Sequence, residues 1–420
     1  MPDCMAPVQI ESENENAFRI NETNFPIGAN TRGMHTPERR FHRGATRYTP
    51  KARMSAALFT SFSMRDLTID NRIVVSPMCQ YSAREGHATD WHVMHLGQMA
   101  QSGAGLVLLE ATAVTSEGRI SPECLGLWSD AHAESLGEVL RAVRAWSPGA
   151  KFGVQLAHAG RKGSTLAPWK GHGQVPTGQG GWQSVAPSTL PFRASDVAPR
   201  ELSELDIADL IQSFVDAAMR ADRIGLDAIE LHAAHGYLMH QFLSPLSNQR
   251  TDAWGGSLTN RMRLVLDVFD AVRAVWPSGK PLGVRVSATD WVDGGWDLPQ
   301  TIELAAALQK RGCDWLDVST GGLDPRQKIE VEPGYQVPFA EAVKQATGMT
   351  TMSVGMITDP EQANEIIASG KADMVALARA FLANPRWPWF AAAVLGEQVA
   401  VPPQYERGVD GSIVRRTPRN

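Results

Sequence analysis

The most constraining feature of this sequence is a repeated alternation between short β-rich apolar runs and stretches with helical periodicity. Such alternation is typical of parallel βα units, in which each helix returns the chain to the start of the next strand. Eight units predict an α/β fold, a (β/α)8 TIM barrel that forms one domain over residues 54–420. The eight runs lie at residues 72–77, 105–114, 151–157, 226–232, 281–287, 314–320, 349–355 and 372–378.

Cap signals support the helices between these runs. Ser203 precedes a long amphipathic run and has the hydroxyl that an N-cap position favours. Another run extends from Asn260 to Trp276, where Pro277 ends it. The largest insertion, residues 160–200, follows the third β-rich run and is rich in Gly, Pro and Trp. Its length is typical of a lid or binding loop over the carboxyl end of the barrel, with a packed surface excursion as the alternative.

Residues 1–53 differ in composition from the rest of the chain. They hold eight Lys or Arg and six Asp or Glu, a net charge of +2, so the whole-chain charge of −5 leaves −7 for residues 54–420. They show no apolar period, and such a segment buries too little surface to offset the entropy of ordering. We therefore expect a disordered N-terminal extension.

This extension has three interpretations, which differ in where they place the protein. A secretory signal is excluded because no apolar segment follows the first basic residues. Residues 31–53 have the basic character of a mitochondrial transit peptide, whereas residues 1–30 carry too many acids for one. The alternative is that Met54 is a usable start, because the sequence reads as folded protein from there. We expect a cytoplasmic protein, and a mitochondrial one if residues 1–53 act as a transit peptide.

The composition of the chain excludes several classes of protein. Its body is mildly acidic without a basic stripe, so small molecules are favoured as partners over nucleic acid. Four widely separated cysteines support neither a disulfide framework nor a thiolate metal or iron-sulfur site. No segment has the roughly 18 apolar residues that a membrane helix needs.

Residues that directly follow the strands build the active site in barrels of this kind. Glycines follow the sixth and seventh runs and Arg379 follows the eighth, which predicts a phosphate-binding site. Turn glycines beside an ion-paired arginine are the alternative. Gln155 offers an amide and Arg285 a permanent positive charge, and a phosphate site with these two groups suits a flavin.

The fourth run ends in His232, which is followed by His235 and Tyr237. Two N–H donors and one O–H donor predict an oxyanion-type site around a substrate oxygen. An H-x-x-H pair is also typical of metal ligands, but no third ligand cluster follows the other runs, so we expect no metal. Cys79 is a candidate because it lies two residues before Tyr81 at a strand end, although most unpaired cysteines are buried packing residues.

Several long motifs carry these residues in a fixed order. They are SPMCQYSA, EATAV with EGRISPECLGLW, FGVQLAHAGRK, LHAAHGYLMHQFLSPLSNQRTDAWGGSLTNR and VGMI. Together they closely resemble the old yellow enzyme family of flavin-dependent enone reductases, and within it the thermophilic-like class of NADPH dehydrogenases. The resemblance covers residues 57–408.

The resemblance implies FMN as cofactor and NADPH or NADH as reductant. Cys79 would lie near the reactive ring and tune its reduction, and Arg285 would lie at the N1/O2 edge. Gln155 would contact the isoalloxazine, and Arg379 would hold the phosphate. The cofactor-binding residues that it implies are Ser76, Pro77, Met78, Cys79, Ala113, Gln155, Arg285, Gly355, Ala378 and Arg379.

The same resemblance implies an α,β-unsaturated carbonyl compound, an enone or enal, as substrate. His232 and His235 would bind its carbonyl oxygen, with help from Tyr81, while hydride passes from NAD(P)H through flavin N5 to the β-carbon. Tyr237 would donate the proton. The motif PPQYERG implies a homodimer or homotetramer in which Arg407 reaches into the neighbouring subunit's site.

Three departures from the family pattern, and two rival functions, remain open. Ala378 stands where glycine is usual, the loop of residues 160–200 carries extra Gly and Trp, and residues 1–53 have no counterpart. One rival is a hydrolase or lyase on the same barrel. Glu110 and Glu230 end strands as a glycosidase pair would. By contrast, Lys151 begins a strand and Lys310 ends a helix, which is wrong for a Schiff base. The other rival is a flavin-binding barrel without catalysis.

Overall fold

The structure is a computed structural model that describes residues 55–415. Within this part of the chain, eight strands close into a barrel in which every neighbouring pair is parallel. Each strand lies inside one of the predicted runs or within a residue of it, so the predicted (β/α)8 barrel is confirmed. The barrel strands are β3 (Ile73–Val75), β4 (Leu106–Ala113), β5 (Phe152–Ala157), β8 (Ala228–Ala233), β9 (Leu282–Ser287), β10 (Trp315–Ser319), β11 (Thr351–Val354) and β12 (Met374–Leu377).

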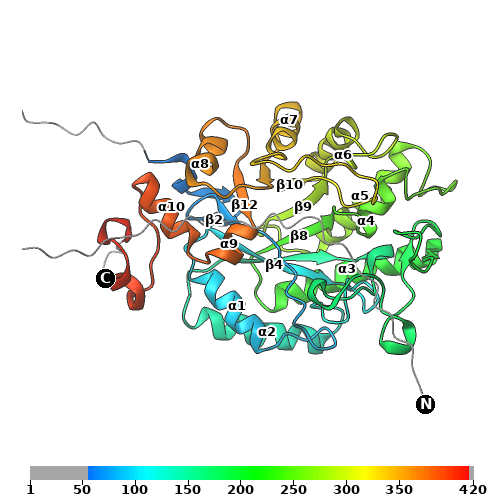
Figure 1. Ribbon diagram of the computed structural model, residues 1–420, viewed down its shortest axis with the longest axis horizontal. Helices are drawn as coiled ribbons and strands as arrows, with labels where there is room; N and C mark the ends of the chain where they lie inside the picture. Colours follow the sequence, from blue (N-terminus) through cyan, green and yellow to red (C-terminus); the bar gives the residue numbers. More distant parts are fainter. Residues whose placement is uncertain (1–54, 416–420) are drawn as a thin grey trace, which may run out of the picture. The chain divides into compact units, whose positions relative to one another are not determined.

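Helices surround the barrel, with α1 and α2 on one side of the strands and α6, α7 and α8 on the other in Figure 1. None of the helices in residues 55–415 is both long and apolar enough to span a bilayer. The predictions for residues 1–53 and for Met54 concern residues outside the described part. The helices are α1 (Asp90–Ala100), α2 (Asp130–Arg144), α3 (Glu204–Arg223), α4 (Leu238–Leu243), α5 (Leu258–Val275), α6 (Leu298–Lys310), α7 (Val337–Thr347), α8 (Pro360–Ala368), α9 (Arg379–Ala383) and α10 (Trp387–Leu395).

The helix starts follow from local cap chemistry. Ser203 caps α3 with a capping box, because its hydroxyl accepts from the Asp206 N–H while the Asp206 carboxylate accepts from the Ser203 N–H. The helix α5 begins two residues before the predicted Asn260, because the Ser257 hydroxyl accepts from the Asn260 N–H. It ends next to Trp276, as predicted.

The apolar core has two parts, one between the strands and the helices and one inside the barrel. The interior part is filled by Leu106, Leu108, Met352 and other large side chains. A side chain at Gly283 would come within 2.0 Å of the Trp315 ring, so this glycine makes room for the indole to lie across the interior. The interior is therefore packed rather than open at this level.

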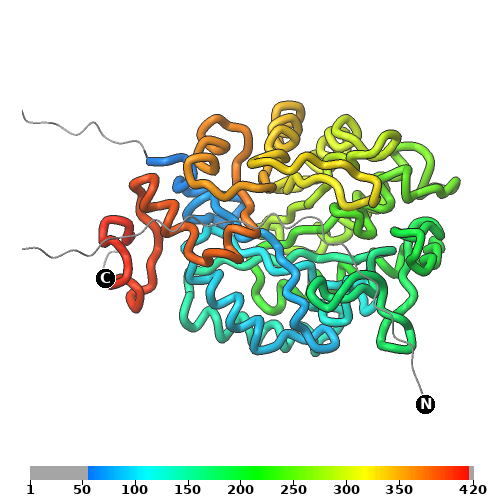
Figure 2. The backbone as a smooth tube through the Cα atoms, viewed as in Figure 1, coloured from blue at the N-terminus to red at the C-terminus, as the bar shows by residue number. Residues whose placement is uncertain are grey.

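The two ends of the barrel are closed differently. A hairpin of β1 (Phe62–Met64) and β2 (Leu67–Ile69) packs its apolar side chains onto the interior at the amino end. The loop of residues 160–200 contains only short 3-10 turns and the small strands β6 (Val185–Ala186) and β7 (Arg200–Glu201). This green loop and the red C-terminal segment lie at opposite sides of the molecule in Figure 2.

Candidate active site

The predicted site residues meet at the carboxyl end of the barrel. Ser76, Pro77, Met78 and Cys79 directly follow β3, and the strands β4, β5, β8 and β9 carry further members. Because all eight strands are parallel, residues at the ends of strands far apart in sequence share one rim. The members in or next to the other strands are Ala113, Gln155, His232, Arg285, Gly355 and Ala378.

The end of β8 and the turn that follows it carry three of the proposed catalytic groups, His232, His235 and Tyr237. The His232 ring lies 5.2 Å from the ring of His235 and 5.0 Å from that of Tyr237, in edge-to-face arrangements. The pKa of each imidazole is lowered well below 6.5, first by burial and then by the positive charge of Arg285. Burial also raises the pKa of the Tyr237 hydroxyl well above 10. All three groups are therefore neutral hydrogen-bond donors over the physiological range.

Hydrogen bonds indicate where the two imidazoles carry their protons. Nδ1 of His232 accepts from a backbone N–H at 3.4 Å, so its proton lies on Nε2. Nε2 of His235 lies 2.7 Å from the Ser319 hydroxyl, which is 3.3 Å from Oε1 of Gln336. That Oε1 already accepts from Thr320 at 2.7 Å. The Ser319 hydroxyl has one proton, so either it donates to Gln336 and accepts from Nε2–H of His235, or it donates to Nε2 and the proton of His235 lies on Nδ1.

Cys79 and the two tyrosines form a small cluster beside this turn. Cys79, Tyr81 and Tyr237 pack against buried Ala111 and Cys124. A hydrogen bond with the Cys124 thiol, burial, and the charge of Glu110 together raise the pKa of Cys79 well above its usual value. Burial raises the pKa of Tyr81 as well. The cluster is therefore a set of neutral S–H and O–H groups, and Cys79 is a protonated thiol rather than a nucleophile.

The interior layer beneath the site holds two carboxyl groups and one cation. Gln155 donates from Nε2 to Glu230 Oε1 at 2.8 Å, so its Oε1 is left as an acceptor. Arg285 lies 3.3 Å from Asp317 Oδ2 and donates to Ser76 Oγ at 3.1 Å. Burial and the neighbouring Asp317 raise the pKa of Glu230 to about 8. Burial also raises the pKa of Asp317, against the effect of Arg285.

The other end of the rim offers the predicted phosphate site. Ala378 directly precedes α9, and Arg379 is its first residue. The Arg379 guanidinium is exposed and has no hydrogen bond or ion pair within residues 55–415. Gly355 follows β11 with a φ of +114°, and a side chain there would meet Gln336 at 2.5 Å. The free cation of Arg379 fits the phosphate of FMN. The acceptor of Gln155 and the charge of Arg285, at the other end, fit the polar edge of its ring.

The loop of residues 160–200 contributes a wall to the site, as expected of a binding loop. The Trp169 ring lies 5.5 Å from the Tyr81 ring, edge to face. A cavity of about 170 Å³ is lined by Tyr81, Tyr237, Lys162 and Phe192 with neighbouring loop residues. Loop aromatics and the two site tyrosines therefore share one cavity.

Lys162 is a site residue that the sequence analysis missed. Its ammonium donates to the carbonyl oxygens of His235 and Gly322, each at 2.8 Å, and lies 5.3 Å from the Tyr237 ring centre. Burial and the charges of nearby arginines lower its pKa to about 7. It follows β5, the kind of position at which a Schiff-base lysine was sought, but its two carbonyl partners give it a bracing role. Its place within the quoted motif FGVQLAHAGRK was the available signal.

Other residues hold the predicted ones in place. Glu230, which the sequence suggested only as part of a glycosidase pair, accepts from Gln155. Ser319 contacts His235, and Gln336 lies between Ser319 and the Gly355 turn. Glu230 alternates with His232 along β8, so the period of two was a signal for it. Gln336 lies in the loop between β10 and α7, where no sequence pattern indicates its partners.

Arg407 is the one proposed site residue that lies away from the rim. It is in the exposed 3-10 segment Pro403–Gly408. Residues just before it line a cavity together with Gly103 and Lys151, which precede β4 and β5. The segment therefore lies at the amino end of its own barrel. Separately, no three His, Cys, Asp or Glu side chains in residues 55–415 group as metal ligands would.

Known proteins share this chain's sequence and fold over most of its length. The model of the NADH:flavin oxidoreductase / NADH oxidase family matches residues 57–395. An NADPH dehydrogenase of Geobacillus sp. (strain WCH70) is 44% identical over 357 residues, which are 84% of this chain and 99% of the relative. An NADH:flavin oxidoreductase of Gibberella zeae is 42% identical over 394 residues, covering 88% and 95% of the two chains. The structure of morphinone reductase in complex with tetrahydroNAD has a TM-score of 0.67 at 28% identity, covering 86% of this chain and 95% of that one.

The chain therefore belongs to the NADH:flavin oxidoreductase / NADH oxidase family, the old yellow enzyme family that its motifs resemble. It is an NAD(P)H-dependent flavin oxidoreductase with FMN as cofactor.

Proposed function

We propose that this site reduces the carbon-carbon double bond of α,β-unsaturated carbonyl compounds. The observation that carries the proposal is that the end of β8 and the turn after it place the neutral side chains of His232, His235 and Tyr237 next to one another. An enone gains negative charge on its oxygen as hydride reaches the β-carbon, and fixed neutral donors stabilise that charge without a counter-charge. When bound, FMN supplies the redox chemistry, since it can accept hydride from a nicotinamide and pass it to an activated alkene.

We propose the following roles for the chain's own residues. Nε2–H of His232 and Nδ1–H of His235 hydrogen-bond the carbonyl oxygen, with the Tyr81 hydroxyl in support. The Tyr237 hydroxyl gives its proton to the α-carbon, which suits a phenol that burial keeps protonated. The acceptor of Gln155 and the cation of Arg285 hold the polar edge of FMN.

The remaining members of the cofactor set act at the phosphate and along the ring. Arg379 and the backbone N–H groups at Gly355 and Ala378 hold the phosphate. The segment Ser76–Cys79, with Ala113, lies along the ring, and the neutral Cys79 thiol modulates reduction.

The hydrolase alternative is disfavoured by the partners of its two carboxyl groups. Glu110 lies 3.3 Å from His92 and accepts from the Gln80 N–H at 3.0 Å. Glu230 accepts from Gln155 and Trp315. Both carboxyl groups are buried and engaged, so neither is free to act as acid or nucleophile on a glycoside.

We further propose a homodimer or homotetramer in the cytoplasm. The segment that carries Arg407 lies at the amino end of its own barrel, whereas the site lies at the carboxyl end. This position suits a role in a neighbouring subunit's site. Multi-angle light scattering gives the oligomeric state. An Arg407→Ala variant that kept full activity as an oligomer would remove Arg407 from the site. The barrel is proposed as a single domain, which limited proteolysis tests.

The deciding experiment is an absorption spectrum followed by an anaerobic titration. The purified protein should carry a flavin spectrum that NADPH bleaches and cyclohexenone restores. Tyr237→Phe should still be bleached by NADPH but lose about 10²- to 10⁴-fold in the rate of restoration, because the proton donor is missing. Bleaching without restoration by any enone would leave a flavin protein that is not an ene-reductase. An unchanged Tyr237→Phe rate would remove the proposed role of this residue.

A further inference from the structure

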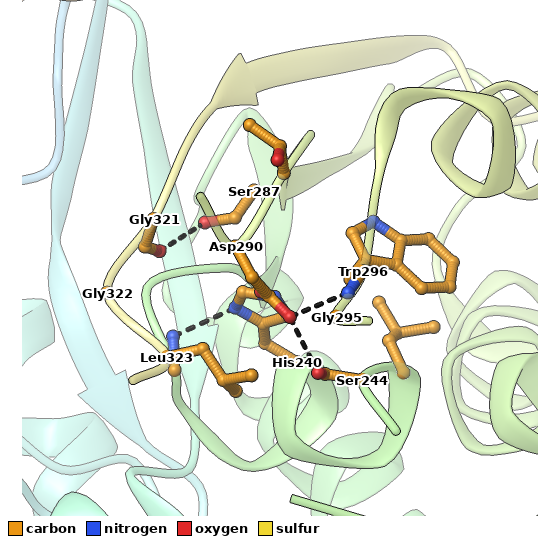
Figure 3. A network of polar contacts seen from close by, with 12 residues as sticks. His240, Ser244, Ser287, Asp290, Gly295, Trp296, Gly321, Gly322 and Leu323 are labelled. Atoms are coloured by element: carbon orange, nitrogen blue, oxygen red, sulfur yellow. Dashed lines mark hydrogen bonds and ion pairs between the residues drawn. The ribbon is translucent and has the colours of Figure 1, made fainter. Parts of the chain in front are cut away.

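A buried histidine–carboxylate pair lies directly behind the turn that carries His235 and Tyr237. His240, in α4, places its Nε2 2.9 Å from Oδ1 of Asp290, which follows β9 in the chain, and both side chains are 0% exposed. The second carboxylate oxygen accepts from the Ser244 hydroxyl at 2.6 Å and from the Trp296 N–H at 2.7 Å. Figure 3 shows Asp290 between these three partners. Its buried charge is therefore surrounded by donors, as a buried carboxylate requires.

The other ring nitrogen of His240 fixes its tautomer. Nδ1 accepts from the Gly236 N–H at 2.9 Å, so it carries no proton. The single proton of the neutral ring therefore lies on Nε2, which is 2.9 Å from Oδ1 of the Asp290 carboxylate. Asp290 thus selects the tautomer that can bind the Gly236 N–H. Asp290, His240 and the Gly236 amide form a chain that ends in the substrate-binding turn.

The turn whose Gly236 N–H donates this hydrogen bond has an unusual backbone. His235 has a φ of +58° and Gly236 a φ of +73°. A side chain at Gly236 would come within 2.2 Å of the Gly322 carbonyl oxygen, so the turn is also tightly packed against the loop that follows β10. A non-glycine residue in the left-handed region persists only where its surroundings hold it there.

Side chains satisfy the backbone polar groups of this turn one by one. The His235 N–H donates to Ser287 Oγ at 2.9 Å, and the His235 carbonyl accepts from Lys162. The Gly236 carbonyl accepts from Gln241 at 2.7 Å, and the Gly236 N–H donates to His240. Of these four side chains, His240 is the one that lies against a buried carboxylate, that of Asp290.

We propose that the His240–Asp290 pair positions the turn for catalysis, a role for two residues that touch neither the substrate nor FMN. The proposal rests on the function proposed above for His235 and Tyr237. These two flank Gly236, so a shift of its amide displaces both donors. Displacements below 1 Å at such groups already lower rates strongly.

Two substitutions of His240 separate its hydrogen bond with Gly236 from its contact with Asp290. In His240→Asn the amide oxygen can occupy the place of Nδ1 and keep the Gly236 bond, while the contact with Asp290 is lost. In His240→Gln the amide nitrogen can occupy the place of Nε2 and keep the Asp290 contact, while the Gly236 bond is lost. We expect kcat for enone reduction to fall on the order of 100-fold in His240→Gln and markedly less in His240→Asn. The rate of flavin reduction by NADPH should stay near that of the unchanged protein in both.

Thr301→Val is the matched control. Thr301 is as buried as His240, accepts from the Trp296 indole at 2.7 Å and donates to the Ala288 carbonyl, but it does not contact the turn. We expect it to lower Tm to a similar extent as the His240 variants and to leave kcat unchanged. Asp290→Asn serves as a second variant if His240→Gln does not fold. The Ser244 and Trp296 donors hold the amide oxygen at the place of Oδ2, so the amide nitrogen faces Nε2 of His240 and no longer favours a proton there.

Amide hydrogen exchange gives a readout that does not depend on turnover. The peptide spanning residues 234–238 should exchange faster in His240→Gln and Asp290→Asn than in His240→Asn or Thr301→Val. Equal losses of kcat in His240→Asn and His240→Gln would overturn the proposal, as would a lower Tm in His240→Gln with kcat and exchange unchanged. If the unchanged protein itself fails to reduce any enone, the proposed function fails. Faster exchange in His240→Gln would still show that the hydrogen bond between His240 and the Gly236 amide orders the turn.

Discussion

The barrel interior differs sharply between its two ends. At the amino end, Leu106, Leu108 and Met352 interlock with the hairpin β1–β2 and contribute only apolar contacts. At the carboxyl end the strands β5, β8, β9 and β10 present Gln155, Glu230, Arg285 and Asp317 to one another. Trp315 spans the boundary, because its ring lies in the apolar cluster while its N–H donates to Glu230 at 3.2 Å. One end therefore supplies stability, and the other gives up some of it to hold charges where a cofactor binds.

The largest expected effect comes from removing the single cation of the polar layer. Arg285→Met leaves two buried carboxyl groups without a positive partner, which should cost about 3–5 kcal/mol in the free energy of unfolding and abolish FMN retention. Adding Asp317→Asn should recover part of the loss. Urea unfolding of the single and double variants, with the flavin content of each, measures both effects.

Leu108→Ala is the matched test at the apolar end. It should cost about 2–5 kcal/mol of stability through the cavity it leaves. The folded fraction should nevertheless keep its FMN, because no charge has been disturbed. If Leu108→Ala lost FMN as readily as Arg285→Met, the contrast between the two ends would not hold.

The next effect is a pH dependence of stability that originates in the polar layer. The pKa of Glu230 is about 8 in the folded chain against an ordinary value of 4.5, so the folded state binds the proton more tightly than the unfolded state. The contribution of Glu230 to the free energy of unfolding is therefore fully present below about pH 4.5. It falls as pH rises towards 8, by about 1.4 kcal/mol per pH unit within that window.

Glu230→Gln tests this origin. The variant should lose most of the slope between pH 5 and pH 8, even though it is less stable at pH 5 because its amide sets a donor against Gln155 or Trp315. Chemical denaturation at a series of pH values measures the slope. A slope that persists in the variant would assign the titration to other groups, with Asp317 first among them.

The sequence predicted the barrel and its rim for one physical reason. Buried parallel strands read as short apolar runs between helical stretches, and their carboxyl ends share one edge, so residues such as Gln155 and Arg285 could be placed together from strand order alone. The pairing of His240 with Asp290 could not. These residues are fifty positions apart, and only the packing of α4 against the loop after β9 brings them into contact.

Lys162 and Ser319 illustrate the same limit. Each acts through a hydrogen bond to His235 that depends on side-chain direction rather than on spacing along the chain. Residue types alone indicate that such side chains can donate or accept, but not to which partner. The sequence therefore indicates which side chains are candidates to contact ligands, but not which groups hold those side chains in place.

A smaller effect should follow from removing the hydroxyl that sets the His235 tautomer. Ser319→Ala lets the His235 proton move to Nε2, where it no longer points to the substrate from Nδ1. We expect kcat/KM for enones to fall about 3- to 30-fold, the equivalent of one hydrogen bond, with flavin reduction by NADPH unchanged. Ser319→Thr, which keeps the hydroxyl, is the control. Equal activity in the alanine variant and the unchanged protein would mean that His235 donates from Nε2.

The smallest expected effect concerns Ala378, where the family usually has glycine. Its φ of −109° and ψ of −77° lie on the negative-φ side that any L-residue can adopt, so the backbone here does not require glycine. Its N–H precedes the free guanidinium of Arg379 and is available to a phosphate whichever residue is present. Ala378→Gly should therefore change the Kd of FMN less than about 2-fold, because the added chain freedom costs at most a few tenths of a kcal/mol at a helix cap. Arg379→Ala in the same titration should weaken binding far more. A large gain in affinity for Ala378→Gly would show that the methyl group crowds the phosphate, and that the family's glycine answers a steric need rather than a conformational one.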